Sequence, residues 1–207
     1  MDNIIQFGEM LLDLEKKDTE RKHVVWKSDI SEAYQILPMH PFWQIKQVNL
    51  IDGEFFVDRC NTFGGCASGS IFIAFNSLVA WIVKNIKHVK YIRNYVDDSS
   101  GCGFADEMDF YTPYNGSYPQ DQVILLKLWD ELGIPHKIKK QIFSSPLSVI
   151  GINVDAYYMT LSLPDKSKKR LIDELRLWSK KGRKEKVKDW YHMGGWVSCG
   201  LNIYPIL

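Results

Sequence analysis

The sequence is poor in cysteine and has no long apolar run. Its 207 residues include four cysteines, whose spacing matches neither a zinc site nor the disulfide framework of a small secreted protein. Residues 1–22 carry acidic side chains early and no apolar stretch long enough for a signal peptide or a membrane span. We therefore expect reduced thiols and a protein of the cytoplasm or nucleus that has no membrane partner.

An excess of charge of one sign is also missing, since the net charge is only +1. The charge is nevertheless uneven, because residues 166–188 hold eleven Lys or Arg against three acidic residues and leave the rest of the chain at −7. A basic segment beside an acidic body favours a partner that is a phosphate polymer, although a solvated, lysine-rich helix would have the same composition. A Gly-rich loop of the P-loop type is absent, which sets small-molecule kinases aside.

With 45% hydrophobic residues the chain can bury a core, and its hydrophobic periodicity predicts both strands and helices. Strands are predicted at residues 23–30 and 54–61, and a two-stranded hairpin at residues 89–104. A long, mostly buried helix is predicted from Ser68 to about Lys87, with one apolar face formed by Ile71, Phe72, Phe75, Leu78, Val79 and Ile82.

Turn and cap residues predict the remaining elements. Pro119 opens a helix that Gly133 closes. A further hairpin is predicted over residues 147–164, turning near Asp155, and basic helices follow, broken at Gly182. The change from strands to lysine-rich helices at Pro164 marks the predicted domain boundary.

Three carboxylates fall where strands end or turn. Asp29 lies at the end of the first strand, and Asp97 and Asp98 lie at the tip of the hairpin. Transfer of a phosphoryl group onto a growing strand is catalysed by two magnesium ions roughly 4 Å apart, and magnesium prefers oxygen ligands. Taken singly, an aspartate after a strand is commonly a helix cap, and an Asp-Asp pair is commonly a turn.

Several motifs occur in the order and approximate spacing of the reverse-transcriptase family. Residues 29–34, Asp-Ile-Ser-Glu-Ala-Tyr, resemble its first palm motif, and residues 95–98, Tyr-Val-Asp-Asp, resemble its paired-aspartate hairpin. Residues 63–72 resemble the retrotransposon form Phe-Gly-x-x-Asn-Ala-Pro-x-x-Phe, with Ala67 and Gly69 in place of its Asn and Pro.

Two further motifs extend the resemblance from about residue 10 to the C-terminus. Residues 132–140 resemble the fourth palm motif, and residues 149–152 resemble the primer-grip hairpin, which is usually Phe-Leu-Gly. Residues 163–171 and 190–207 are most similar to DIRS-type and related retrotransposon polymerases.

The resemblance implies an α+β fold, a polymerase palm with an antiparallel sheet and helices on one face, plus a small helical thumb-like C-terminal part. Residues 1–163 would form the palm, with the fingers largely missing, and residues 164–207 a basic, helical thumb-like or connection-like segment.

The resemblance also implies roles for single residues. Asp29 and Asp97 would be the principal ligands of two Mg²⁺ ions, for which Mn²⁺ can substitute, with Asp98 as the third carboxylate and the Ile30 carbonyl assisting. Tyr34 falls where the family places an aromatic ring that excludes a 2′-hydroxyl, which implies deoxynucleotide substrates. RNA-directed RNA polymerases usually have a second aspartate there.

Further residues would contact nucleotide and nucleic acid. Lys140 is the best match to the fourth-motif lysine, which would meet the triphosphate or protonate pyrophosphate, and Lys139 is nearly as good a match. Phe63 and Gly64 would lie against the nucleotide or the template. The residues that would contact primer and template are Tyr95, Gly151, Lys168, Lys169 and Arg170.

The implied function is that of an RNA-directed DNA polymerase from a retrotransposon. Its partners would be dNTPs, an RNA or DNA template with primer, and other parts of a retrotransposon polyprotein. Few residues precede Asp29, so the fingers cations that cover the triphosphate are not found, and ribonuclease H, protease and integrase motifs are not found either. The alternative is a catalytically inactive remnant or fragment that at most binds nucleic acid.

Overall fold

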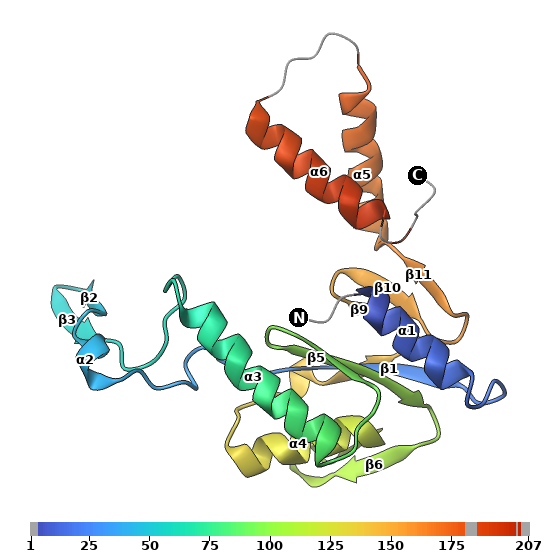
Figure 1. Cartoon of the computed structure of the whole chain (residues 1–207), viewed down its shortest axis with the longest axis horizontal. Coiled ribbons are helices and arrows are strands. Elements are labelled where there is room, and N and C mark those ends of the chain that lie inside the picture. The colour runs from blue at the N-terminus through green and yellow to red at the C-terminus, as the bar shows by residue number, and fades with distance from the viewer. Residues whose placement is uncertain (1–3, 181–185, 202, 204–207) are drawn as a thin grey trace.

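The computed structural model describes residues 4–180, 186–201 and 203. Its centre is a four-stranded antiparallel sheet with the strand order β4-β5-β1-β8 (Figure 1). The strands are β1 (His23–Asp29), β4 (Ile92–Tyr95), β5 (Asp98–Phe104) and β8 (Ile142–Ser144). The predicted hairpin over residues 89–104 is confirmed as β4 and β5, which pair from Ile92 with Gly101 to Tyr95 with Asp98.

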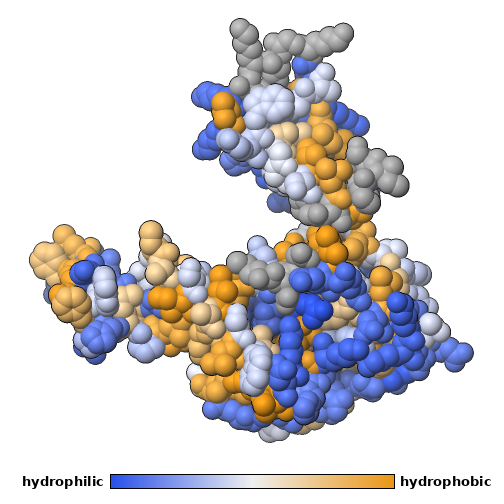
Figure 2. All heavy atoms as spheres, viewed as in Figure 1, coloured by the Kyte–Doolittle hydropathy of each residue, from blue (hydrophilic) through white to orange (hydrophobic). Residues whose placement is uncertain are grey.

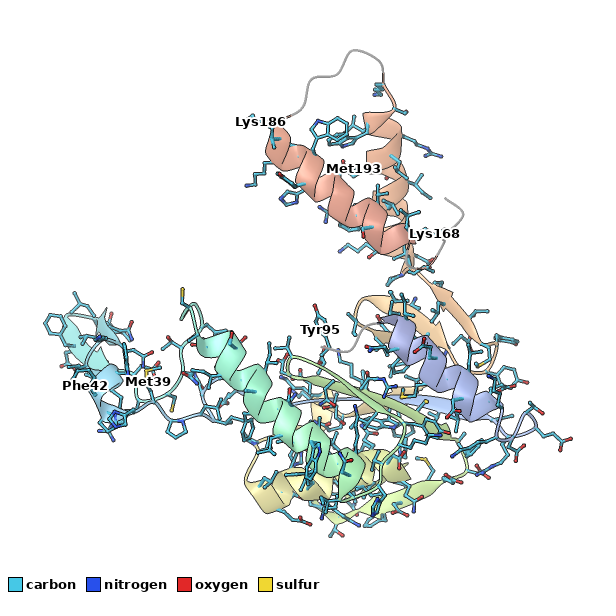
Figure 3. The ribbon with its side chains drawn as sticks, in the orientation of Figure 1. Met39, Phe42, Tyr95, Lys168, Lys186 and Met193 are labelled. Atoms are coloured by element: carbon cyan, nitrogen blue, oxygen red, sulfur yellow. The ribbon has the colours of Figure 1, made fainter. Side chains whose placement is uncertain are left out.

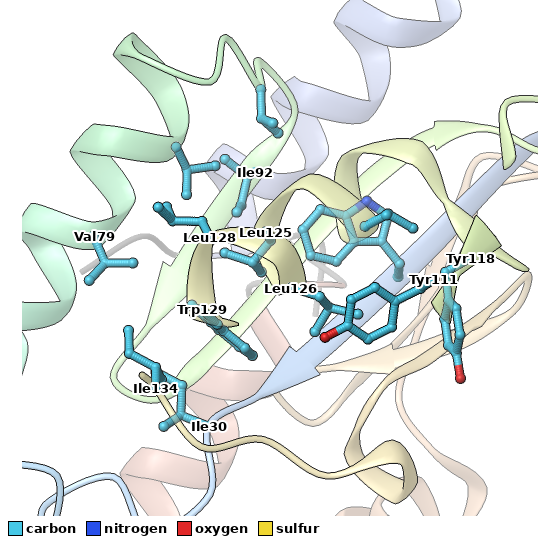
Figure 4. Packing of buried hydrophobic residues seen from close by; sticks show 14 of the residues in the cluster. Ile30, Val79, Ile92, Tyr111, Tyr118, Leu125, Leu126, Leu128, Trp129 and Ile134 are labelled. Atoms are coloured by element: carbon cyan, nitrogen blue, oxygen red, sulfur yellow. The ribbon is translucent and has the colours of Figure 1, made fainter. Parts of the chain in front are cut away.

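Helices α3 (Ser68–Asn85) and α4 (Gln120–Leu132) pack on one face of this sheet. Trp26 projects from β1 into the same cluster and is fully buried. Trp129 of α4, labelled in Figure 4, is fully buried there too. The predicted ends of α4 are confirmed, since Pro119 precedes its first residue and Gly133 closes it at a φ of 68°. A left-handed residue after the last helical turn is most easily a glycine.

The opposite face of the sheet is covered by α1 (Ile4–Glu15) and a second, three-stranded sheet. The second sheet has the order β11-β10-β9. Its strands are β9 (Leu147–Val149), β10 (Ile152–Asp155) and β11 (Thr160–Ser162). Phe7 and Leu14 of α1 are buried in one cluster with Val25, whose side chain leaves β1 on the face opposite to Trp26. The sequence had predicted no element for α1.

Residues 38–61 form an arm that extends from the body of the protein (Figure 1). It contains α2 (Pro41–Gln44) and the hairpin of β2 (Val48–Ile51) and β3 (Glu54–Val57). Every residue of both strands is exposed. The predicted strand over residues 54–61 is therefore shorter than expected and belongs to no larger sheet.

The prediction that the helix from Ser68 is mostly buried was wrong for part of its apolar face. Phe72 and Val79 are buried, but Ile71 is 46% exposed and Leu78 is 58% exposed. The reason is that the cluster around α4 and β1 covers only one side of α3, so that an apolar residue on its other side meets solvent.

The remaining elements are a separate two-stranded sheet and two helices near the C-terminus. β6 (Met108–Tyr111) and β7 (Gly116–Pro119) form a hairpin before α4. Helices α5 (Asp165–Trp178) and α6 (Val187–Leu201) form a pair that stands off the rest of the described chain (Figure 1). The predicted break at Gly182 lies outside the described residues, and the domain boundary at Pro164 stays a prediction. Among the described residues, no helix is both long and apolar enough to cross a membrane.

Candidate active site

The register of the central sheet places two of the three predicted carboxylates opposite each other. Asp29, the last residue of β1, pairs with Asp98, the first residue of β5. Side chains that are directly opposite in an antiparallel pair project from the same face. Both carboxylates therefore leave the sheet on the side of Val25, away from α3 and α4, with side-chain exposures of 24% and 27%.

The third carboxylate, Asp97, lies in the turn between β4 and β5. Its neighbour Val96 has a φ of 55°, a conformation that a β-branched residue rarely adopts. The Val96 carbonyl accepts a hydrogen bond of 2.5 Å from Nδ2 of Asn76, a buried residue of α3. Helix α3 thus anchors the strained turn that carries Asp97, and strain of this kind is concentrated at functional sites.

Two lysines contact the carboxylates. Lys27 Nζ lies 2.9 Å from Asp98 Oδ2. Lys140 Nζ lies 2.9 Å from Asp29 Oδ2 and donates a hydrogen bond of 3.2 Å to the carbonyl oxygen of Ile30. The ammonium group of Lys140 therefore sits between two of the groups predicted to bind metal.

Two buried glutamine side chains form hydrogen bonds with the end of β1. Gln122 of α4 donates from Nε2 to Ser28 Oγ and to the Lys27 carbonyl, at 3.0 and 3.2 Å. Gln141 donates from Nε2 to the Asp29 carbonyl at 3.3 Å. The sequence prediction missed both glutamines and Lys27. The signal for Lys27 was present, because a residue two positions before Asp29 on a strand shares its face.

A polar network supports the segment opposite Ile30. His136, which forms an isolated bridge with Ile30, approaches Asp130 Oδ1 through Nε2 at 3.1 Å, and its Nδ1 lies 2.5 Å from the Tyr114 hydroxyl. Tyr111 donates to Asp130 at 2.6 Å. Burial, together with the negative charge of Asp130, raises the pKa of Tyr114 to about 12. Burial and the hydrogen bond to Asp130 also raise the pKa of Tyr111, so both tyrosines stay neutral at physiological pH.

The charges of the three neighbouring carboxylates favour the binding of a cation. Burial raises the pKa of Asp98, and the charges of Asp29 and Asp97 raise it further, while the hydrogen bond from Lys27 opposes them. Like charges that share a site disfavour ionisation of each other, and a cation relieves that repulsion.

The donor set fits magnesium in its chemistry. Carboxylates and a backbone carbonyl are hard oxygen ligands. Asp29 Oδ1 is buried and has no hydrogen-bond partner, so it is available as a ligand. As the side chains stand, no three acidic, His or Cys side chains within the described ranges converge closely enough to hold a metal ion.

Of the residues predicted to contact the nucleotide, Tyr34, Phe63 and Gly64 lie near the start of α3, whereas Lys140 lies beside Asp29. The Tyr34 ring meets those of Phe63 and Phe72 edge to face, with centroids 4.7 and 5.5 Å apart. Phe63 is 74% exposed, and Gly64 has a φ of 90°, which a residue with a Cβ would adopt only with strain.

The residues predicted to contact primer and template are spread over three places (Figure 3). Tyr95 is 41% exposed and pairs with Asp98. Gly151 lies in the tight turn between β9 and β10. The cations of α5 belong to the separate helix pair, where the Arg170 guanidinium lies over the ring of Trp196 at 4.7 Å. Lys168 and Lys169 are exposed on the same helix.

Comparison with solved structures identifies the fold. A foamy viral protease-reverse transcriptase in complex with dsDNA superposes with a TM-score of 0.59 at 16% identity, covering 85% of this chain and 32% of that one. The fold is reverse-transcriptase-like. The foamy viral enzyme with an RNA/DNA hybrid gives 0.57 at 16% identity, covering 84% and 20%, and a dRH form with dsDNA gives 0.57 at 18%, covering 86% and 28%. No protein-family model and no curated protein matches the sequence.

The reverse-transcriptase-like fold confirms the predicted α+β class, with antiparallel sheets and helices packed on them. The chain spans about a third or less of the length of the solved structures that it matches. The resemblance to DIRS-type elements in particular stays a prediction.

Proposed function

We propose that this chain is the palm-centred part of an RNA-directed DNA polymerase that transfers deoxynucleotides onto a primer. One observation carries the proposal. Asp29 and Asp98 face each other across β1 and β5, next to the strained turn that contains Asp97, on the side of the sheet that α3 and α4 leave free. The reverse-transcriptase-like fold supports it.

In this proposal the oxygen ligands come from Asp29, Asp97, Asp98 and the Ile30 carbonyl, and they would hold two Mg²⁺ or Mn²⁺ ions. When bound, such ions neutralise charge on the attacking and leaving oxygens of the phosphoryl transfer. Gln141 and Gln122 position the end of β1 that carries the first of these ligands.

Other side chains would orient the nucleotide. Tyr34, held edge to face by Phe72, would block the space that a 2′-hydroxyl needs. Lys140 would meet the triphosphate, since its side chain already reaches the carboxylate site and is 40% exposed. Its neighbour Lys139 is exposed in the structure.

The proposed nucleic-acid partner is an RNA or DNA template with its primer. Lys168, Lys169 and Arg170 would contact its phosphates, and Tyr95 and Gly151 would lie along the primer. The foamy viral enzymes were solved with dsDNA and with an RNA/DNA hybrid. We further propose an origin in a retrotransposon of DIRS type, with activity in the cytoplasm or nucleus beside other parts of a polyprotein.

The decisive experiment is primer extension on an RNA template with dNTPs and Mg²⁺ or Mn²⁺. Wild type is run beside the Asp97→Ala, Asp98→Ala double variant, with circular dichroism to show that both are folded. Extension by wild type alone establishes the activity. If neither folded protein extends the primer under any metal condition, the catalytic proposal is wrong.

The second candidate function is an inactive domain that binds nucleic acid. The observation in its favour is that two of the three carboxylates already form ion pairs with lysines. This candidate predicts binding of a labelled RNA/DNA hybrid without extension, and binding that is equal in wild type and in the double variant.

A further inference from the structure

The position of Lys140 suggests a role before any metal binds. Its Nζ is within 3.2 Å of two oxygens, Asp29 Oδ2 and the Ile30 carbonyl, that come from consecutive residues at the end of β1. An ammonium group is a compact point charge with three donors. It therefore satisfies the same oxygens that a divalent cation would need.

The contact also offsets negative charge in the protein when no metal is bound. Asp29, Asp97 and Asp98 lie at one end of the sheet and act on each other's charge. Asp29 is only 24% exposed, and a partly buried carboxylate without a positive partner is destabilising. The ammonium of Lys140 supplies that charge.

The attachment of Lys140 allows it to leave. It is the last residue of the short helical turn η2 (Ile138–Lys140), outside the sheet, and its side chain is 40% exposed. Lys27 differs, because it is part of β1, contacts Asp98 through one oxygen and is 24% exposed. Lys140 is thus the lysine whose ammonium can withdraw into solvent without disturbing a strand.

We propose that Lys140 is a resident counter-cation of the carboxylate site, which holds Asp29 and the Ile30 carbonyl until a divalent cation displaces it. The inference rests on the proposed metal site. Its consequence is that metal binding and the Lys140 ion pair exclude each other. The displaced ammonium remains charged and is then free to meet an anionic ligand such as a triphosphate.

The test compares Lys140→Met, which removes the charge and keeps the length, with Lys140→Arg, which keeps the charge, and with Lys139→Met, a neighbouring exposed control. Mn²⁺ affinity is measured by electron paramagnetic resonance, and thermal unfolding is followed in EDTA and in Mn²⁺. Neither readout requires polymerase activity, and Asp29→Asn serves as the variant without the principal ligand.

We expect Lys140→Met to melt at a lower temperature than wild type in EDTA and to bind Mn²⁺ about three- to fivefold more tightly. That factor is the size expected for one partly exposed ion pair that no longer competes. Lys140→Arg should bind no more tightly than wild type, and Lys139→Met should match wild type in both readouts.

Two other outcomes separate the inference from the proposed function. If Asp29→Asn abolishes Mn²⁺ binding while Lys140→Met binds as wild type does or more weakly, the metal site stands and the counter-cation role is overturned. If wild type, Lys140→Met and Asp29→Asn all fail to bind Mn²⁺, the proposed metal site is wrong and the inference falls with it.

Discussion

The packing of a neighbouring side chain requires glycine at position 101 of the central sheet. Gly101 pairs with Trp26 across β1 and β5, and the indole ring of Trp26 covers it. A Cβ atom at this position would lie 2.3 Å from Trp26 Cζ2 and 2.4 Å from the Tyr91 carbonyl oxygen. Trp26 is fully buried beneath α4, so neither the ring nor the backbone has room to yield.

We therefore expect Gly101→Ala to lower the free energy of unfolding by about 1–3 kcal/mol through overpacking. Gly103, two residues along the same strand, has no atom within 4 Å of the corresponding position. Gly103→Ala is the matched control and should change stability little. Urea unfolding of both variants measures the difference, and an equal effect of the two substitutions would show that Trp26 does not set the requirement.

Asp121, in the first turn of α4, makes the stability of the protein depend on pH. Burial raises the pKa of its carboxyl to about 6, with a further contribution from Glu107 and an opposing one from Lys17. In the unfolded chain this pKa is near 4. The native state therefore binds more protons than the unfolded state between about pH 4 and pH 6, so stability falls as the pH rises through this window.

The substitution Asp121→Asn should abolish this contribution to the pH dependence of stability. We expect the variant to be more stable than wild type at pH 8, by at most about 2 kcal/mol because Asp121 is partly exposed, and to lose the advantage near pH 4. Urea unfolding at the two pH values checks it, with Glu9→Gln on the surface of α1 as the control. A stability difference between Asp121→Asn and wild type that does not vary with pH would contradict the assignment.

Among the elements, the arm of residues 38–61 is the least supported. Its two strands pair only with each other, and Phe55, Leu50 and Phe56 are 77, 63 and 47% exposed. Figure 2 shows apolar side chains gathered at the end of the arm. A two-stranded hairpin with no packing partner is marginally stable in water. By contrast, β1 is paired on both edges and covered on both faces.

Hydrogen exchange should separate the two elements. We expect the paired amides of β2 and β3 to exchange at least about 100-fold faster than those of β1 and β5, since local opening of the arm exposes almost no buried apolar surface. Mass spectrometry of peptic peptides measures the rates at pH 7. Equal protection of the arm and the central sheet would show that another surface covers the arm in solution.

Over the whole molecule, the carboxylates and the basic helix lie in different parts. Asp29 and Asp98 belong to the central sheet, whereas Lys168, labelled in Figure 3, and Lys169 belong to the α5–α6 pair. Rings of Trp178 and Trp190 meet edge to face at 4.6 Å and hold the two helices together. If the proposed function holds, a nucleic acid must contact both parts at once.

Because the two parts are separate, we expect that removing basic side chains from α5 changes the salt dependence of nucleic-acid binding and leaves the central sheet folded. Replacing Lys168 and Lys169 by Gln should weaken binding of an RNA/DNA hybrid and lower the slope of log K against log salt by up to about 2, close to one per lost phosphate contact. Lys127→Gln, on the exposed side of α4, is the control. Fluorescence anisotropy between 50 and 200 mM salt gives the slopes, and an unchanged slope in the double variant would exclude α5 from the interface.

Local signals in the sequence were enough to predict several features. Pro119 and Gly133 set the ends of α4 because their backbone preferences act within one turn of the chain. The hairpin that carries Asp97 and Asp98 was predicted from the composition of the two strands that flank the Asp-Asp pair, and the structure confirms it. The order of the motifs was enough to predict an α+β fold like that of reverse transcriptases, which the structural comparison confirms.

The partners of those residues were decided only in three dimensions. The pairing of Asp29 with Asp98, the packing of α1 beneath the sheet and the contact of Lys140 with Asp29 all join segments that are distant in the chain. The exposure of the arm could not be predicted either, because the sequence of an apolar strand has the same pattern whether or not another element covers it. Burial and ion pairing depend on which surfaces meet, and this depends on long-range packing.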